Sequence, residues 1–514
     1  MRRNLAAAVV TLSLAVTSAA ASPSSADDGF RIQSPGNPAS AQPGSGPSAM
    51  LRQAEAALEG EVAGTRRPDA TLALRDLFAT LPRLSAGDRV RARAILARPT
   101  QGDNDPYGDG YTVSSKRRCT PKICIHWVPT TVDAPPSGRW VSRSLRTVRR
   151  VWSKEVGKLG YRRPVTDGRR GGNSKFDVYL SDVGAKGLYG YCAPEFTKPG
   201  YPRIASGYCV LDNDFARSQF DAKPSDSLKV TAAHEFFHAV QFAYDYLEDP
   251  WMMEATATWI EERYADGAND NRQYLPAGQL VKTFTPLDTF DQDSAVQYGN
   301  WVFFEYLSKR FGQGVVRRIW KQSGAFKGDG KTYSTNAVKR VLPRTVSFKK
   351  LFSQFSSANI TPSRSYPEGR FWPTPTLVSQ GTLGRGEDTS GTLTIDHMST
   401  QDVRITPEAS LDRRKFKLRI NVDGPASQTA PAAAIVRQKR SGGFERLSIR
   451  LSSTGAGSTV VPFNQRQTKR VWLVVSNAST RFDCDGNDFT YSCSGTPRDD
   501  ARKFQVSFRV ITRS

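Results

Sequence analysis

Periodic apolar positions begin only about fifty residues into the chain. Residues 22–49 are rich in Ser, Pro, Gly and Ala, a composition typical of a disordered leader. Helical patterns then cover 50–62 and 70–96, and Pro82 interrupts the second pattern before Ser85 provides a new N-cap. A linker dense in Gly, Asp and Pro follows. We predict a small helical segment here, rather than a self-sufficient domain.

The next part of the chain, to about residue 355, mixes strand and helix patterns. Short apolar runs predict buried strands at 124–129, 176–180 and 207–211, and near-helical spacing predicts an amphipathic helix at 140–159. A helix beginning near Ser225-Asp226-Ser227, which offers good N-cap chemistry, is followed by helices at 251–264 and 297–310. This mixture indicates an α/β-type domain, which we place at 106–365.

Beyond about residue 365 the pattern becomes all-β. Turn residues separate short apolar runs at 392–395, 416–422, 433–437, 446–451, 471–476 and 504–511. These runs predict a β-sandwich of about 150 residues, and we assign it residues 366–514. The expected fold class is therefore α+β, with a helical N-terminal segment and a C-terminal sandwich.

The N-terminus predicts export. Arg2 and Arg3 precede an apolar run and a stretch of small residues ending near Ala21, so residues 1–21 have the pattern of a secretory signal peptide. The run is too short to span a membrane, and no later stretch approaches about 18 consecutive apolar residues. We predict a secreted protein without a transmembrane segment, in which residues 22–105 form a leader and a helical prosegment.

The six cysteines suit an extracellular protein with three disulfides. They fall into sequence-local pairs: Cys119 with Cys124, Cys192 with Cys209, and Cys484 with Cys493. Six cysteines allow 15 connectivities, so the local pairing is a preference and not a deduction. None has the C-x-x-C spacing of a zinc site.

The formal net charge of +23 favours anionic partners, such as an anionic cell-wall polymer bound through the basic surface. The basic residues are spread along the chain, and no nucleic-acid-binding motif accompanies them, so we predict no specific nucleic-acid partner. A solvated basic surface that aids solubility is the simpler interpretation.

The strongest chemical motif is His234-Glu235-Phe236-Phe237-His238, an H-E-x-x-H sequence within a predicted helix. Histidines four residues apart project from one helical face, close enough to share a metal ion. Zinc lowers the pKa of a bound water towards neutrality, and a neighbouring carboxylate can take its proton. The motif therefore predicts a zinc site with Glu235 as general base.

A catalytic zinc usually has three protein ligands and one position open for water. Gln241 and Tyr244 stand where a metzincin has Gly and a third His, which excludes that family. A Glu on the next helix is the alternative. Glu254 can return to the metal if the motif helix ends soon after its second histidine, since each turn adds about 5.4 Å of travel. Glu248 competes, although it falls in the turn. We predict three metal ligands: His234, His238 and Glu254.

The segment His234-Glu235-Phe236-Phe237-His238-Ala239-Val240-Gln241, followed by Glu254-Ala255-Thr256-Ala257-Thr258-Trp259, resembles a family of secreted bacterial zinc metalloproteases of the gluzincin type. The segments 175–180, 190–194 and 211–214 agree with it, and the likeness covers roughly residues 70–325. The resemblance implies a zincin-like fold, and it implies that Glu235 passes its proton to the leaving amine.

Two further positions are interpreted through this resemblance. Gluzincins often carry a Tyr or His that stabilises the tetrahedral oxyanion, and Tyr298 is the candidate, although a Tyr packed in the core fits equally well. Thermolysin-like enzymes usually place an Asp four residues after the glutamate ligand, where this chain has Thr258. Either Glu261 or Glu262 then orients a zinc-bound histidine, or the surroundings of the metal differ.

Calcium is a second candidate cofactor. Carboxylates and amides gather after one predicted strand and around the last cysteine pair: Asp212, Asn213 and Asp214, and Asp483, Asp485, Asn487 and Asp488. Such groups also occur in ordinary turns, and the EF-hand spacing is absent. His126 and His397 are isolated, and we expect them to be structural.

These observations predict a secreted zinc metallopeptidase that hydrolyses peptide bonds in protein or peptide substrates, with endopeptidase activity expected. Residues 22–118 contain no Cys, so a prosegment would have to block the cleft sterically. A rival from another class is a secreted binding protein or adhesin with a structural or vestigial zinc site, in which a fourth protein ligand would close the site. A zinc hydrolase acting on other bonds is a second rival.

Overall fold

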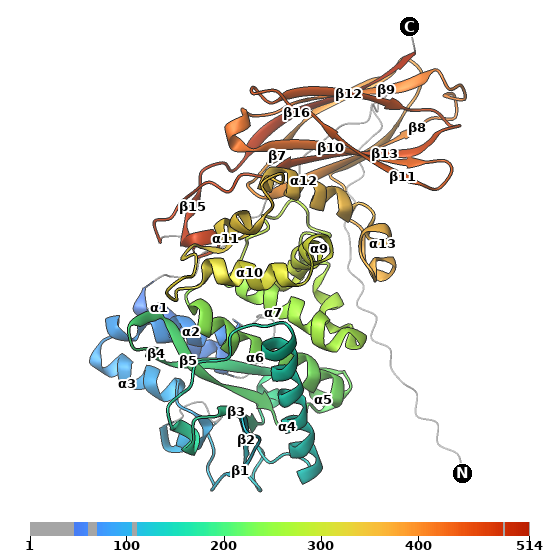
Figure 1. The fold of residues 1–514 in the computed structure, drawn as a ribbon. Helices are drawn as coiled ribbons and strands as arrows, with labels where there is room; N and C mark the ends of the chain where they lie inside the picture. The colour runs from blue at the N-terminus through green and yellow to red at the C-terminus, as the bar shows by residue number, and fades with distance from the viewer. Residues whose placement is uncertain (1–45, 60–68, 105–109, 487–488, 513–514) are drawn as a thin grey trace, which may run out of the picture.

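The computed structural model describes residues 46–59, 69–104, 110–486 and 489–512. These residues form an α+β structure with a mixed sheet flanked by helices, a further group of helices and a C-terminal β-sandwich (Figure 1). The α+β class predicted from the sequence is confirmed. The predicted signal peptide and most of the leader lie outside the described residues. Within the described part, no helix has the length and apolar character needed to cross a membrane.

Three helices open the described chain: α1 (Pro47–Leu58), α2 (Ala70–Thr80) and α3 (Ala86–Ile95). The Asp69 carboxylate caps α2 by accepting the Leu72 N–H at 2.8 Å, and the Ser85 hydroxyl caps α3. The chain breaks at Pro82 in a 3₁₀ turn, as the sequence predicts, because proline cannot continue the ladder of helical hydrogen bonds.

The first sheet has the strand order β1-β2-β3-β5-β4. Its strands are β1 (Lys116–Cys119), β2 (Ile123–Trp127), β3 (Phe176–Ser181), β4 (Gly190–Lys198) and β5 (Tyr201–Asp212). The three inner strands are parallel, and β1 and β4 run antiparallel at the two edges. The inner strands are those that apolar runs predict. Strand β1 is polar and mostly exposed, so no such run marks it.

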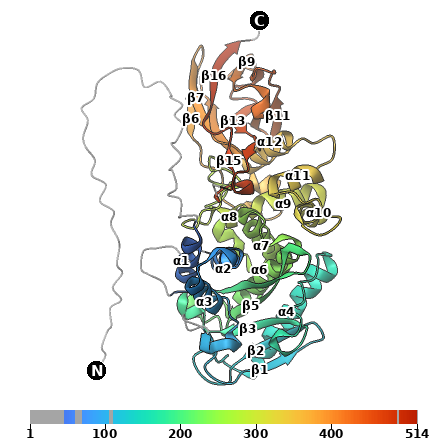
Figure 2. The ribbon, with the colours of Figure 1, turned by 90° about the vertical axis from the view of Figure 1, so that its left-hand side faces the viewer.

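Helices cover both faces of this sheet (Figures 1 and 2). Successive strand residues point to opposite faces. Tyr179 and Tyr208 pack in one buried cluster with the apolar residues of α1, α2 and α3. Val178 and Leu211 lie in the cluster that also contains residues of α4 (Gly138–Trp152) and α6 (Pro224–Asp245). The N-terminal helices are thus one of the two layers that bury the sheet.

All three predicted disulfides form. Cys119–Cys124 closes the β1–β2 hairpin, Cys192–Cys209 joins β4 to β5, and Cys484–Cys493 closes a loop near the C-terminus. The local pairing was preferred only from spacing, and strand pairing gives its physical reason, since each of the first two pairs joins directly opposed strand residues.

The N-cap of α6 lies two residues before Ser225, the first of the residues predicted to cap it. Pro224 is the first helical residue and Lys223 is the N-cap, which makes no side-chain hydrogen bond. The predicted cap at Ser225-Asp226-Ser227 is therefore wrong. Proline suits the first helical position, because its missing N–H would have no partner there and its φ is already helical. The next helix, α7 (Pro250–Ala265), begins in the same way.

The predicted helix at 297–310 is divided in two, α8 (Val296–Gly299) and α9 (Trp301–Phe311), at Asn300. The buried Asn300 side chain donates to the Leu287 carbonyl at 2.7 Å and accepts the Gln279 N–H at 2.9 Å.

Other helices are α5 (Arg217–Phe220), α10 (Gly314–Ser323), α11 (Ser334–Val341), α12 (Phe348–Asn359) and α13 (Pro362–Ser365). A π-helical turn, Ser153–Lys158, continues α4.

The C-terminal sandwich contains two packed sheets, β11-β10-β13-β8-β6 and β12-β9-β16-β7. The strands are β6 (Ser379–Leu383), β7 (Asp388–Ile395), β8 (Ser399–Pro407), β9 (Phe416–Asp423), β10 (Pro431–Lys439), β11 (Phe444–Ile449), β12 (Ala456–Pro462), β13 (Thr468–Asn477) and β16 (Arg502–Thr512). The short pair β14 (Phe482–Asp483) and β15 (Thr496–Pro497) lies beside it. Six strands overlap the predicted runs. Strand β8 has no apolar run, because its first half buries polar residues such as Gln401 and Asp402.

His397 lies buried where the sandwich meets the helices. Its Nε2 lies 3.0 Å from Asp288 Oδ1, and its Nδ1 lies 2.5 Å from Asp500 Oδ1. Burial alone would lower the pKa of His397, but the two carboxylates outweigh it and raise this pKa to about 10. His397 is therefore a charged structural residue that links the sandwich to the segment before α8.

We predict that His397→Gln lowers the free energy of unfolding by roughly 3 kcal/mol at neutral pH, because Asp288 would keep a buried charge without its partner. Because the pKa of His397 is higher in the folded than in the unfolded state, its charged form stabilises the fold. This stabilisation is complete below the unfolded-state pKa of about 6.5, and it is lost as pH rises through the folded-state pKa. Denaturant titrations of both proteins should show a difference that shrinks as pH approaches 10. A difference that stays constant over this range would contradict the assignment.

Candidate metal centre

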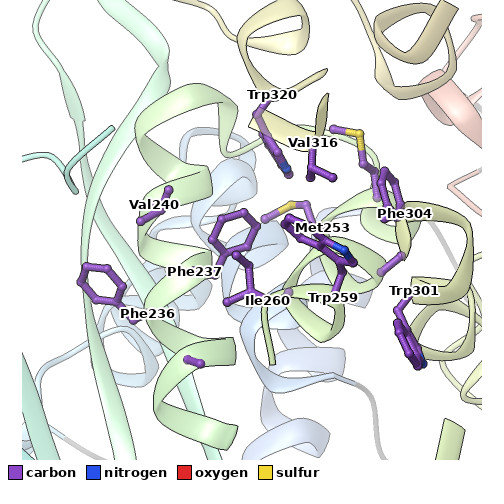
Figure 3. Packing of buried hydrophobic residues seen from close by; sticks show 14 of the residues in the cluster. Phe236, Phe237, Val240, Met253, Trp259, Ile260, Trp301, Phe304, Val316 and Trp320 are labelled. Carbon is purple, nitrogen blue, oxygen red and sulfur yellow. The ribbon is translucent and has the colours of Figure 1, made fainter. Parts of the chain in front are cut away.

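Apolar packing fixes the position of α6 against α7. Phe237 and Val240 on α6 lie in one buried cluster with Met253 and Ile260 on α7, and Figure 3 shows these side chains together with Trp320 of α10. The chain reverses at 246–249. The start of α7 therefore lies beside the histidine face of α6, and a residue in its second turn can meet both histidines.

His234, His238 and Glu254 converge at this contact, with their ligand atoms within 4.8 Å of one another. His234 Nε2 lies 3.2 Å from Glu254 Oε2, and His238 Nε2 lies 3.4 Å from Glu254 Oε1. Glu248, the competing ligand in the sequence, points elsewhere and accepts the N–H groups of Asp249 and Ser334. The structure thus brings together the three residues predicted as ligands.

Both imidazole rings are oriented through their Nδ1 atoms. His234 Nδ1 lies 2.7 Å from Glu261 Oε1, and His238 Nδ1 lies 2.7 Å from Gln241 Oε1. The Gln241 amide is itself fixed, because its Nε2 donates to the Met253 carbonyl at 2.8 Å. Since a carboxylate and an amide oxygen only accept, each Nδ1 carries the proton. Each Nε2 is therefore the nitrogen that would bind a metal ion, and a metal ion would replace the proton that the raised pKa of His234 favours.

Glu261 provides the carboxylate that orients His234, a role that Thr258 does not fill. It lies seven residues after Glu254, two turns along α7 and on the same face. The Thr258 hydroxyl is buried and has no hydrogen-bond partner among the described residues. Glu262, the other candidate, accepts a hydrogen bond from Asn271 at 2.9 Å instead. Of the alternatives that the sequence left open, the geometry selects Glu261.

The donor set fits a divalent cation. His238 Nε2 and Glu254 Oε1 are buried atoms that make no hydrogen bond with any described residue. Buried polar atoms normally find a partner, because an unpaired one keeps the cost of its desolvation. Two imidazole nitrogens and one carboxylate are also the ligands of many catalytic zinc sites. A zinc ion held by His234, His238 and Glu254 would satisfy both atoms.

Burial also shifts the acidity of the surrounding carboxyl groups. It raises the pKa of Glu254 to about 8, and the nearby Asp69 contributes to this rise. Burial likewise raises the pKa values of Glu235 and Glu261 to about 7. For His234, burial opposes the charged form, but Glu254 and Glu261 outweigh it and raise the pKa well above its usual value. Burial therefore disfavours the ionised form of these carboxyl groups, and a bound cation would favour it.

A pocket of about 330 Å³ opens beside the centre and is lined by His234, Glu235 and Tyr298. The Tyr298 ring lies 6.1 Å from the His234 ring, and its hydroxyl hydrogen-bonds to the Asp69 carboxylate. The predicted general base and the predicted oxyanion-stabilising residue thus face the same pocket as the first histidine. The start of α2 forms another wall of this pocket.

Two further residues line the pocket, Asp69 and Thr71, and the sequence did not predict either as a site residue. The Thr71 hydroxyl donates to Glu235 Oε2 at 3.0 Å across 164 positions of the chain. Asp69 carries one usable signal, because it precedes an apolar helical run and suits an N-cap. Nothing in that local pattern indicates its contact with Tyr298.

Several of the candidate calcium ligands, and His126, make hydrogen bonds within the fold. The Asp212 carboxylate accepts backbone N–H groups, including those of Gly184 at 2.6 Å and Phe215 at 2.5 Å. The Asn213 amide donates to two carbonyls. His126 pairs with Asp177 at 2.8 Å. Calcium at these residues or near Asp483 and Asp485 stays a prediction, and Asn487 and Asp488 lie outside the described residues.

Comparisons with known proteins add little to this geometry. No family model matches the chain, and no curated protein matches it. One solved structure similar to part of the chain is the pre-peptidase C-terminal domain of a collagenase from Bacillus anthracis, with 8% sequence identity and a TM-score of 0.15. The similarity covers 26% of this chain and 94% of that domain. No family is identified by it.

We predict that Glu261→Gln weakens zinc binding about 10- to 100-fold, because the carboxylate that fixes His234 and raises its basicity is lost. Competition with a chromogenic chelator measures the affinity. Glu262→Gln is the matched control, since this neighbouring carboxylate contacts Asn271 and not a histidine. Equal zinc affinities in the two variants would contradict the role given to Glu261.

Proposed function

We propose that the protein is a secreted zinc metallopeptidase of the gluzincin type, with His234, His238 and Glu254 as zinc ligands. The observation that carries this proposal is the convergence of the three donors at the α6–α7 contact, with two buried donor atoms that lack any other partner among the described residues. Zinc bound there supplies a Lewis acid that polarises a carbonyl group and increases the acidity of a water molecule.

Glu235 would act as the general base. It lies on the same helix as both histidines and lines the open pocket beside them. Burial raises the pKa of Glu235 to about 7, so its carboxyl group is able to accept and return a proton near neutral pH. In this role it takes a proton from water and later delivers it to the leaving amine.

Tyr298 would donate its hydroxyl proton in a hydrogen bond to the oxyanion. Burial raises the pKa of Tyr298 well above its usual value, so the phenol stays protonated and able to donate. A preorganised donor of this kind stabilises charge that develops only in the transition state. The ring packs against Tyr274 with centroids 5.1 Å apart, which limits its movement.

The arrangement supports an enzyme over a binding protein with a structural zinc. Among the described residues, three potential metal ligands meet at this contact, whereas a structural zinc site usually has four protein ligands. The five-stranded sheet with antiparallel strands at its edges, followed by two helices that carry the ligands, supports a zincin-like fold. Three disulfides agree with secretion. An anionic cell-wall polymer remains our proposed partner for the basic surface.

We predict that Glu235→Gln reduces hydrolysis of an unfolded protein substrate at least about a hundredfold, because the amide cannot accept the proton. Zinc content should stay at one ion per chain, since all three ligands are retained. Mass spectrometry of the products and metal analysis of the same samples measure the two quantities. Hydrolysis that is unchanged both in this variant and after chelation would exclude the proposed mechanism.

A further inference from the structure

The first turn of α2 lines the pocket beside the proposed zinc site and contacts two of its proposed functional residues. Asp69, Ala70 and Thr71 line that pocket together with His234, Glu235 and Tyr298. On the basis of the proposed function, we propose that this turn is an intramolecular inhibitor: Thr71 engages the general base, Asp69 engages the oxyanion-stabilising Tyr298, and peptide substrate enters only when residues 69–71 are displaced.

Thr71 engages two groups at once. Its hydroxyl donates to Glu235 Oε2 at 3.0 Å and accepts the Cys192 N–H of β4 at 3.0 Å. One oxygen of the general base is therefore occupied, and so is a main-chain donor at the edge of the sheet. The hydroxyl is buried with both partners, so water does not compete for these bonds.

Asp69 is held by both of its carboxylate oxygens. Oδ1 accepts the Leu72 N–H at 2.8 Å and caps α2, while Oδ2 accepts the hydroxyl of Tyr298. A helix N-terminus stabilises a carboxylate at this position. The same carboxylate lines one pocket with Glu235, and its charge contributes to the raised pKa values of Glu254 and Glu235. A divalent cation at the histidines would turn this repulsion into attraction.

Buried arginines hold the rest of the N-terminal helices in place. On α2, Arg75 donates to the Glu248 carbonyl at 2.9 Å. Arg98, after α3, pairs with Asp167 at 2.7 Å and with Asp177 and Glu195 at 2.6 Å each. This anchoring keeps the first turn of α2 next to the site, where it acts at a high effective concentration against any peptide in solution. Only a local movement of residues 69–71 is needed to open the pocket.

An alternative is that the turn is a permanent wall of the substrate site. The two interpretations predict opposite effects of removing its side chains. Loss of an inhibitor tightens the binding of an active-site ligand, whereas loss of a wall weakens it. If the pocket is open in fewer than about one molecule in ten, the apparent affinity for an active-site ligand is at least about tenfold lower than that of the open form.

The test uses the zinc-loaded full-length protein with Asp69→Ser and Thr71→Ala combined. Serine keeps an N-cap acceptor for α2, so the helix is preserved, but it is too short to reach Tyr298 as well. Calorimetric titration with a short peptide hydroxamate measures access to the metal and the groove. We expect the double variant to bind the hydroxamate about tenfold or more tightly than the unsubstituted protein. Hydrogen exchange of the α2 amides should rise only in the first turn.

The matched control is Ser85→Ala with Asp88→Ser on α3, which changes a second helix cap and a second carboxylate away from the pocket. This control should bind the hydroxamate as the unsubstituted protein does. Equal or weaker binding by the Asp69/Thr71 variant, with zinc bound, would overturn the inhibitory role and leave the proposed function intact. Failure of every form to bind zinc or hydroxamate would overturn the proposed function and the inhibitory role with it.

Discussion

Four carboxylates and two histidines share one small region between α2, α6 and α7. Glu235, Glu254 and Glu261 are all buried there, and Asp69 lies close enough to raise the pKa of two of them. Like charges in a poorly solvated region repel strongly, so the folded chain must neutralise them with protons or with a cation. The Nδ1 atoms of both histidines are already committed to Glu261 and Gln241, so their Nε2 atoms face this negative charge. The balance of this charge, by protons or by the proposed cation, is the constraint on the rest of the site.

Holding such a group together requires rigid surroundings, and contacts distant in sequence provide them. Asp249, directly before α7, accepts the Cys493 N–H at 2.8 Å and the Ser334 hydroxyl. Ser492, beside it, donates to Asp288, which also pairs with His397. The start of the helix that carries Glu254 is therefore fixed by a loop near the end of the chain. Hydrogen bonds thus connect the sandwich to the candidate metal centre, and a change at their junction should reach α7.

Local chemistry made the central features predictable from the sequence. Helical geometry places His234 and His238 on one face, and the short turn before the next helix allows Glu254 to reach them. Features that depend on long-range contacts were not predictable. The helix break at Asn300 depends on its hydrogen bonds to Gln279 and Leu287. Strand β8 has no apolar run because its buried polar side chains hydrogen-bond to other polar groups. The choice of Glu261 over Glu262 depends on how α7 is rotated, and contacts of Asp69 and Thr71 span more than 160 positions.

The N-terminal helices have two roles that constrain each other. They cover one face of the five-stranded sheet, where Tyr179, Tyr191 and Tyr208 are almost fully buried. Removing the helices would expose this aromatic surface and would leave the carboxylates around Arg98 without their partner, a change that typically costs about 3–5 kcal/mol for a buried pair. In the first turn of α2, Ala70 and Leu72 also pack in the buried clusters, whereas Asp69 and the Thr71 hydroxyl are held by hydrogen bonds. A small shift of residues 69–71 that breaks these hydrogen bonds therefore disturbs far less of the core than full release of the segment would.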